Sequence, residues 1–403
     1  MTAPRFPASD AAWARYQQAL NDARDQVLAT EYVSDPALRA QAMYFLQMQQ
    51  VSAMNHCVAP RSLYPALYVH SMFMPYEIST GQACPDFLYR WCYMDGRRRY
   101  RLWGRRGSTH WVDLQVTSGF WGDENVRHVG NLSFDRMQFG ADGSFDLIFS
   151  ASEQPGNWMG LDAASPNNLL LVREAAYDWD DEVDTRMHIE ILDREPGDTL
   201  GYTPEEMDRR VQRAARFIDT STGFSLRTTK KVVDAVGRNR FWSSEAERKA
   251  NASIAGANPQ AVMNFMVFDI RPDEALILEA PRVNARYTSL SLGDLWWFNL
   301  DHVHHHGSIN ERQTHFDADG MWRAVLSFDD PGVPNWLDPG RSPMGVVIHR
   351  LYLSDALPIP TVKKVPFADV ALHLPADTPR VTPAERAATV ARRARAVMRR
   401  YGF

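Results

Sequence analysis

Histidines gather in one short segment of the chain: five of the twelve lie between positions 302 and 315. Alternate side chains of an extended strand share a face, so His302, His304 and His306 would point the same way. Three imidazoles at this spacing could bind one zinc or iron ion and leave a coordination position open for water or a substrate. Glu311 follows shortly after and could add a carboxylate. We therefore take His302, His304, His306 and Glu311 as candidate catalytic residues, and the three histidines as candidate metal ligands.

The same histidines could also work without a metal. Neutral imidazoles can line a pocket as hydrogen-bonding groups, or act as acids and bases near neutral pH. A solvated loop would contain them equally well. Three alternate residues span roughly 13 Å along a strand, so convergence on one ion requires a bend, which Gly307 could supply. The sequence leaves the metal site, the metal-free pocket and the solvated loop open.

Three large aromatic residues, Trp296, Trp297 and Phe298, stand shortly before the histidines. Strand alternation would send Trp296 and Phe298 to one face and Trp297 to the other. One face would enter the protein core, and the other could form the wall of an apolar ligand site. The ordinary core of a β-sandwich would use the same residues. As candidate substrate-binding residues we take Trp296, Trp297, Phe298, Asp301 and Asn310.

An internal duplication is the first clue to the elements that position this segment. One stretch of the chain runs from Asp142-Gly143 through Asn157-Trp158 to Arg173, and another runs from Asp319-Gly320 through Asn335-Trp336 to Arg350. As many residues separate Asp142 from Arg173 as separate Asp319 from Arg350. This agreement predicts two copies of one fold. It also predicts that the equivalent arginines are structural ion-pair partners.

Each copy is predicted to be a β-sandwich or jelly roll, which makes the fold class mainly β with flanking helices. Short runs alternate in polarity, as in Tyr287–Leu292, and turn clusters such as Pro331–Asn335 separate them. Helix starts are indicated by Asp35-Pro36, Thr203-Pro204 and Thr382-Pro383. The predicted units are a helical N-terminal segment (1–60), a first β-sandwich (61–195), a mainly helical connector (196–260), a second β-sandwich with the histidine segment (261–375) and a C-terminal amphipathic helix (376–403). That last helix is predicted to keep a solvated basic side formed by Arg392, Arg393, Arg395, Arg399 and Arg400.

Composition excludes several classes of protein. The chain of 403 residues is 45% hydrophobic and 23% charged with a net charge of -5, which is typical of a globular protein and gives no reason to expect a nucleic-acid partner. Three cysteines are too few for a disulfide framework, so we expect reduced thiols. We find no secretory signal and no long apolar run, and we therefore expect no membrane span and a cytoplasmic location. Without a nucleotide-binding loop or a serine-hydrolase elbow, we expect no nucleotide or organic cofactor.

Several motifs resemble a family of bacterial proteins. In the second copy these motifs are Trp296–Asp301, Ser308-x-Asn310, Asp317–Gly320 and Pro331–Asp338, and they resemble the domain of unknown function 1214. In the first copy they are Pro85–Phe87, Tyr100–Gly107 and Arg173-Glu174, and they resemble its usual partner, the domain of unknown function 1254. The resemblance implies paired β-sandwich domains and brings no established activity or catalytic residues. Many relatives read Asp-Tyr-Val-Asn-Arg-Gln where this chain has His302–His306 after Asp301, so histidine chemistry would be particular to this branch.

Function hypotheses of three classes follow from these features. The first is an enzyme of hydrolase or lyase type, with or without metal assistance, that acts on a hydrophobic or aromatic small molecule in a pocket of the second sandwich domain. The alternative is a non-catalytic binding protein for a lipid, an aromatic compound or a glycan. The third is an assembly protein that uses its helices as contacts in a homo-oligomer.

Overall fold

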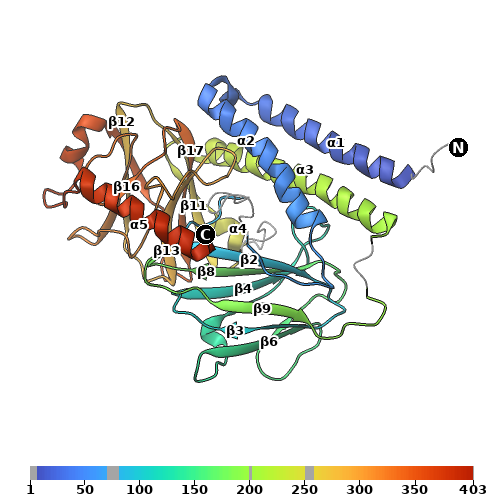
Figure 1. Cartoon of the computed structure of the whole chain (residues 1–403). Coiled ribbons are helices and arrows are strands. Elements are labelled where there is room, and N and C mark those ends of the chain that lie inside the picture. The colour runs from blue at the N-terminus through green and yellow to red at the C-terminus, as the bar shows by residue number, and fades with distance from the viewer. Residues whose placement is uncertain (1–6, 70–80, 199–201, 250–257, 403) are drawn as a thin grey trace.

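The computed structural model describes residues 7–69, 81–198, 202–249 and 258–402. Four β-sheets form two sandwiches, and helices flank them (Figure 1). The prediction of a mainly β fold with two related domains is confirmed.

The first domain pairs a five-stranded sheet with a four-stranded sheet, and its core lies between them. The five-stranded sheet has the order β1 (Tyr68–Val69), β2 (Phe87–Met94), β8 (Asn168–Ala175), β4 (Trp111–Thr117) and β5 (His128–Ser133). The four-stranded sheet has the order β7 (Trp158–Gly160), β6 (Ser144–Ser150), β3 (Tyr100–Arg105) and β9 (Arg186–Ile191).

The second domain repeats this order strand for strand. Its five-stranded sheet runs β10 (Phe241–Ser243), β11 (Ala261–Asp269), β17 (Met344–Tyr352), β13 (Tyr287–Gly293) and β14 (Ser308–Asn310). Its four-stranded sheet runs β16 (Trp336–Leu337), β15 (Met321–Leu326), β12 (Glu274–Pro281) and β18 (Thr361–Pro366). The one parallel pair of each domain, β6 with β7 and β15 with β16, also recurs. Strand β10 lies inside the stretch predicted to be a mainly helical connector, because it completes the edge of this sheet.

Three long helices lie across both domains on one side of the molecule (Figure 1). They are α1 (Pro7–Leu28), α2 (Pro36–Ala53) and α3 (Pro204–Val236), and a π-helical turn (Met54–Val58) continues α2. The predicted start of α2 is correct, since the Asp35 carboxylate accepts the backbone N–H groups of Ala37 and Leu38 at 2.8 and 3.1 Å. Short helices complete the fold: α4 (Glu245–Lys249) and the 3-10 turns Glu31–Ser34, Phe134–Arg136 and Phe367–His373. No helix in the described ranges is long and apolar enough to cross a membrane.

The C-terminal helix α5 (Pro383–Tyr401) connects the two domains. Arg392, Arg395 and Arg399 on its predicted basic side are exposed as expected, whereas Arg393 and Arg400 are not. Its Arg393 is buried and donates to the carbonyl of His302 at 2.9 Å in the second domain. Its Arg400 pairs with Asp184 of the first domain at 3.0 Å. The prediction of a solvated side is wrong for these two arginines, because buried backbone carbonyls and a carboxylate need their donors.

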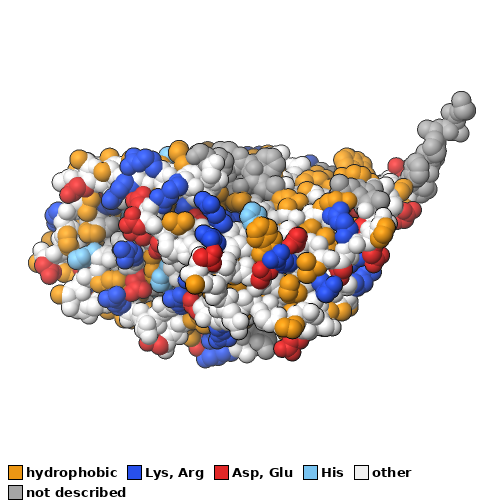
Figure 2. Space-filling model, turned by 60° about the horizontal axis from the view of Figure 1, so that its bottom comes forward, with side chains coloured by type: hydrophobic (Ala, Val, Ile, Leu, Met, Phe, Trp, Pro, Cys, Tyr) orange, Lys and Arg blue, Asp and Glu red, His pale blue; other side chains and the backbone are white. Residues whose placement is uncertain are grey.

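Charged side chains of both signs are interspersed on the face of the molecule seen in Figure 2, and hydrophobic side chains are scattered among them. The three cysteines are buried and form no disulfide, as expected.

The two five-stranded sheets meet at an aromatic cluster that includes Phe87 and Trp111 of the first domain and Tyr287 and Tyr352 of the second. Beside this cluster lies the carboxylate of Asp86, which is fully buried. It accepts hydrogen bonds from the Trp179 indole at 2.7 Å, from the Asn310 amide at 2.8 Å and from the Tyr287 hydroxyl. Since Tyr287 and Asn310 belong to the second domain, this one carboxylate joins the domains.

We expect Asp86→Ala to lower the free energy of unfolding by about 3 kcal/mol or more, because three buried donors would lose their acceptor. Chemical denaturation followed by tryptophan fluorescence measures the loss. The exposed Asp377 provides the matched control, and Asp377→Ala should change stability by less than about 0.5 kcal/mol. Equal stability of the two variants would contradict this role of Asp86.

Candidate functional site

The histidine segment is not a strand. Residues 301–307 form bends and irregular structure, and strand β14 begins only at Ser308. The Asp301 carboxylate accepts the backbone N–H groups of Val303 and His304 at 2.8 and 2.9 Å, and these bonds curl the chain. The prediction that His302, His304 and His306 share a strand face is therefore wrong.

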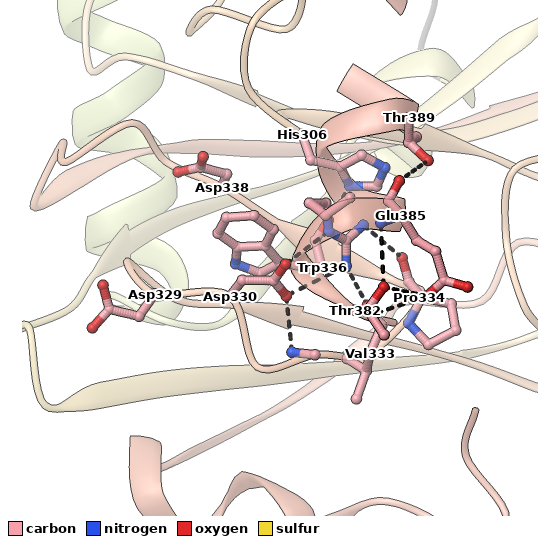
Figure 3. Close-up of polar contacts among 12 residues, drawn as sticks. His306, Asp329, Asp330, Val333, Pro334, Trp336, Asp338, Thr382, Glu385 and Thr389 are labelled. Carbon is pink, nitrogen blue, oxygen red and sulfur yellow. Dashed lines mark hydrogen bonds and ion pairs between the residues drawn. The ribbon is translucent and has the colours of Figure 1, made fainter. Parts of the chain in front are cut away.

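Each of the histidines has a different partner. The Nδ1 atom of His304 lies 3.1 Å from Asp301, and that of His305 lies 2.7 Å from Asp338. The Nδ1–H of His306 donates to the carbonyl of Trp336 at 2.5 Å, beside the start of α5 (Figure 3). Among the described residues, no group of three His, Cys, Asp or Glu side chains could hold a metal ion. The predicted ligand set is thus not assembled.

Burial also makes two of these histidines poor acids or bases at neutral pH. Burial and, after it, the positive charge of nearby Arg393 lower the pKa of His302 to about 4 and the pKa of His306 to about 3. Both imidazoles are neutral at pH 7. The fourth predicted catalytic residue, Glu311, forms an ion pair with Arg282 at 3.1 Å. These four side chains form no common site.

The loop that faces His306 is fixed from α5. Arg386 donates to the Asp330 carboxylate at 2.9 Å and to the carbonyl of Val333 at 2.5 Å. At the first turn of the helix, the Thr382 hydroxyl and the Glu385 carboxylate form a capping box (Figure 3). The polar groups of this region are used in holding α5 to the second domain.

Between the two domains and α3 lies a cavity of about 540 Å³. The two five-stranded sheets, the middle of α3 and the short helix α4 line it, and α4 contributes the carboxylate of Glu247. Its aromatic lining consists of Tyr89, Trp91, Phe120, Trp121, Phe224, Trp242, Phe265, Trp297 and Tyr352, and its basic lining consists of Arg173, Arg227, Lys231, Arg248 and Arg350. This cavity is the candidate functional site.

The duplication supplies matching walls. Trp91 pairs with Leu171 across β2 and β8, and Phe265 pairs with Ile348 at the equivalent position of β11 and β17. All four side chains line the cavity. Two residues along the same strands, Tyr89 lies opposite Arg173 and Met263 lies opposite Arg350. The cavity therefore lies where the two copies face each other.

Trp297 is the one predicted substrate-binding residue that lines the cavity. Its backbone is left-handed (φ 68°), in a turn where Asp294 accepts the N–H groups of Trp296 and Phe298 at 2.9 Å. The Trp297 indole donates to Thr229 of α3 at 2.9 Å. Trp296 and Phe298 point the other way into the core, so the predicted division of the three aromatics between two sides is correct.

The other two predicted binding residues, Asp301 and Asn310, do not line the cavity. Asp301 holds the bend described above. Asn310 donates to Asp86 at 2.8 Å and to the carbonyl of Tyr177 at 3.1 Å, at the junction of the domains.

Sequence reasoning missed the residues that helices bring to the cavity. His56 lies in the π-helical turn, and its ring stacks on Trp91 with the centroids 4.4 Å apart and on Phe217 at 5.5 Å. Phe224 comes from α3, and its ring meets Trp297 edge to face. A π-helical turn leaves no clear pattern in a sequence, although such turns are frequent at functional sites.

The equivalent arginines Arg173 and Arg350 are buried at the floor of the cavity. Their predicted role as ion-pair partners is only partly correct. Arg173 has the Asp113 carboxylate 3.9 Å away, whereas no carboxylate in the described ranges lies within ion-pair distance of Arg350. Burial raises the pKa of Asp113 to about 6, and Arg173 opposes that rise.

Comparison with solved structures identifies the fold. A crystal structure of an uncharacterised protein from Burkholderia cenocepacia matches 89% of this chain and 97% of its own, with a TM-score of 0.81 and 23% identity. A protein from Vibrio parahaemolyticus is matched over 72% of this chain and 91% of its own, with a TM-score of 0.43 and 12% identity. No protein-family model and no curated protein matches the sequence. The first match shows that this two-domain fold exists elsewhere; the resemblance to the domains of unknown function 1254 and 1214 stays a prediction.

Acid should destabilise the protein partly through His306. Its pKa is about 6.5 when unfolded and about 3 when folded, so its contribution to stability is complete above pH 6.5 and is lost as the pH falls toward 3. Between pH 7 and pH 4.5, we expect the free energy of unfolding of His306→Asn to fall by about 2 to 3 kcal/mol less than that of the wild type. Denaturant titrations at both pH values give the change in free energy of unfolding for each protein. Comparing these changes removes any packing loss of the variant, and identical changes would contradict a buried neutral His306.

Proposed function

We propose that the chain binds a hydrophobic or aromatic small molecule in the cavity between its two domains. The observation that carries the proposal is the preformed cavity of about 540 Å³ with aromatic walls from both domains and α3. Small-molecule sites typically measure roughly 300 to 1,000 Å³ and combine apolar walls with a few polar groups. The cavity has this size and this composition.

The rigidity of the walls supports binding. Trp297 is held by its hydrogen bond to Thr229 and is almost fully buried among Val346 and Ile348. On the opposite wall, the ring of Trp91 is stacked between those of His56 and Tyr68, with centroid distances of 4.4 and 4.8 Å. Side chains that are already fixed lose little conformational entropy when a ligand enters.

The place of the site differs from the expected one. The sequence favoured a pocket within the second domain around residues 296–311, whereas the cavity needs both domains. Hydrolase or lyase chemistry by the histidine segment stays a prediction, and no contact among the described residues favours it. Binding is the function that the cavity supports best.

An uncharged apolar dye, N-phenyl-1-naphthylamine, tests this function because its fluorescence rises in apolar surroundings. We expect saturable binding to the wild type. Met263→Trp adds bulk to the cavity wall and should raise the dissociation constant at least about tenfold.

The control is Met398→Trp, which makes the same exchange at an exposed position of α5. It should leave the dissociation constant unchanged. Two results would overturn the proposed function: no saturable signal with the wild type, or equal affinities of the two variants for the dye.

A further inference from the structure

The floor of the cavity brings together two guanidinium groups that the duplication makes equivalent. Arg173 lies in β8 and Arg350 in β17, the central strands of the two five-stranded sheets. Both are almost fully buried, and both line the cavity. Their charges act on the same two phenols, Tyr89 and Tyr352, which also line it. The two guanidiniums therefore face one small region of the site.

Neutral groups hold the Arg350 guanidinium, and Arg173 has a neutral partner besides Asp113. Arg173 donates to the Gln115 side chain at 2.6 Å. Arg350 donates to the Ser291 hydroxyl and to the backbone carbonyl of Gln82. A guanidinium has five N–H donors, and its planar fork matches a carboxylate. In the described part of the chain, the bonds of Arg350 occupy only two of its nitrogens.

The two arginines differ in their charged partners. The Asp113 carboxylate lies 3.9 Å from Arg173, whereas no carboxylate in the described ranges lies within ion-pair distance of Arg350. Two asparagines, Asn131 and Asn258, donate to that same carboxylate at 2.7 and 2.8 Å. A buried positive charge without a partner is costly, and a ligand that carries one negative charge would remove that cost.

We propose that the ligand is an amphipathic carboxylate: its carboxylate binds between Arg173 and Arg350, and its apolar body lies against Trp91, Phe265 and Trp297. This inference rests on the proposed function, since it assigns a chemical class to the ligand of the same cavity. A single negative charge matches the one positive charge of Arg350, whereas the dianion of a phosphate monoester would bring one negative charge more than that. The ligand would contact both domains.

A matched pair of ligands tests the charge. 2-Naphthoate and 2-naphthamide share a ring system and differ in the anionic group. In competition with the dye N-phenyl-1-naphthylamine, we expect 2-naphthoate to bind at least about tenfold more tightly than 2-naphthamide. We expect 2-naphthyl phosphate, the third arm, to bind more weakly than 2-naphthoate.

Variants of the floor locate the effect. Arg350→Gln should weaken 2-naphthoate binding by about tenfold to one-hundredfold and change 2-naphthamide binding by less than about threefold. Arg386→Gln is the matched control, because it removes a buried arginine of α5 that bonds to Asp330, away from the cavity, and it should leave both affinities unchanged. If Arg350→Gln does not fold, Arg350→Lys keeps the charge and should still lose part of the preference for 2-naphthoate.

Four outcomes would overturn the carboxylate site, and they separate it from the proposed function. Equal affinities of 2-naphthoate and 2-naphthamide, or stronger binding of 2-naphthyl phosphate, would reject a carboxylate as the ligand's anionic group but not the cavity as a binding site. A preference for 2-naphthoate that survives in Arg350→Gln would place the anion elsewhere. Failure of both naphthalene ligands to displace bound dye would also reject the carboxylate site, while failure of the dye itself to bind would reject the function.

Discussion

A single buried carboxylate, that of Asp86, holds the two five-stranded sheets together by accepting hydrogen bonds from both domains. Burial raises its pKa, while its donors, above all Tyr287 and Asn310, favour the charged form. Nearby, the Cys84 thiol lies 2.9 Å from the Tyr287 hydroxyl. Removing any one partner would leave polar groups without water or a bond, so the packing of the domains is specified by this network as well as by apolar contact. The cavity lies between the same two sheets.

The duplication makes the two walls of that cavity alike in backbone and unlike in chemistry. At the position next to Arg173 in β4 the first domain has Asp113, whereas the second domain has Ser289 next to Arg350 in β13. At this pair of equivalent positions only the first domain has a carboxylate. The two copies therefore differ in charge here, and this difference would orient the proposed ligand.

Much of the fold could be predicted from the sequence because its signals are local. The Asp-Gly turns and the Asn-Trp pairs recur at the same intervals in the two copies, and helix starts such as Asp35-Pro36 depend on neighbouring residues alone. The sequence also predicts that the side chains of Trp296 and Trp297 point in opposite directions. A tight turn at Asp294, and not a strand, is the reason that they do.

The cavity could not be predicted, because it exists only where distant elements meet. Nothing in the sequence near Arg350 indicates that α3 and the first domain will enclose it. The histidine segment misled for a related reason: the spacing of His302, His304 and His306 suits a strand, yet Asp301 bends the backbone and sends each ring to a different partner. The sequence shows that Arg173 and Arg350 are equivalent, but only the structure shows that no carboxylate of the described residues lies close to Arg350.

The proposed ligand, a small apolar molecule with a carboxylate at the floor of the cavity, can be located in a crystal structure of the protein in complex with 2-naphthoate. We expect electron density for the naphthalene ring between Trp91 and Phe265, with the carboxylate within hydrogen-bond distance of Arg350. Density for the ligand at another place, or an empty cavity at saturating ligand, would contradict it.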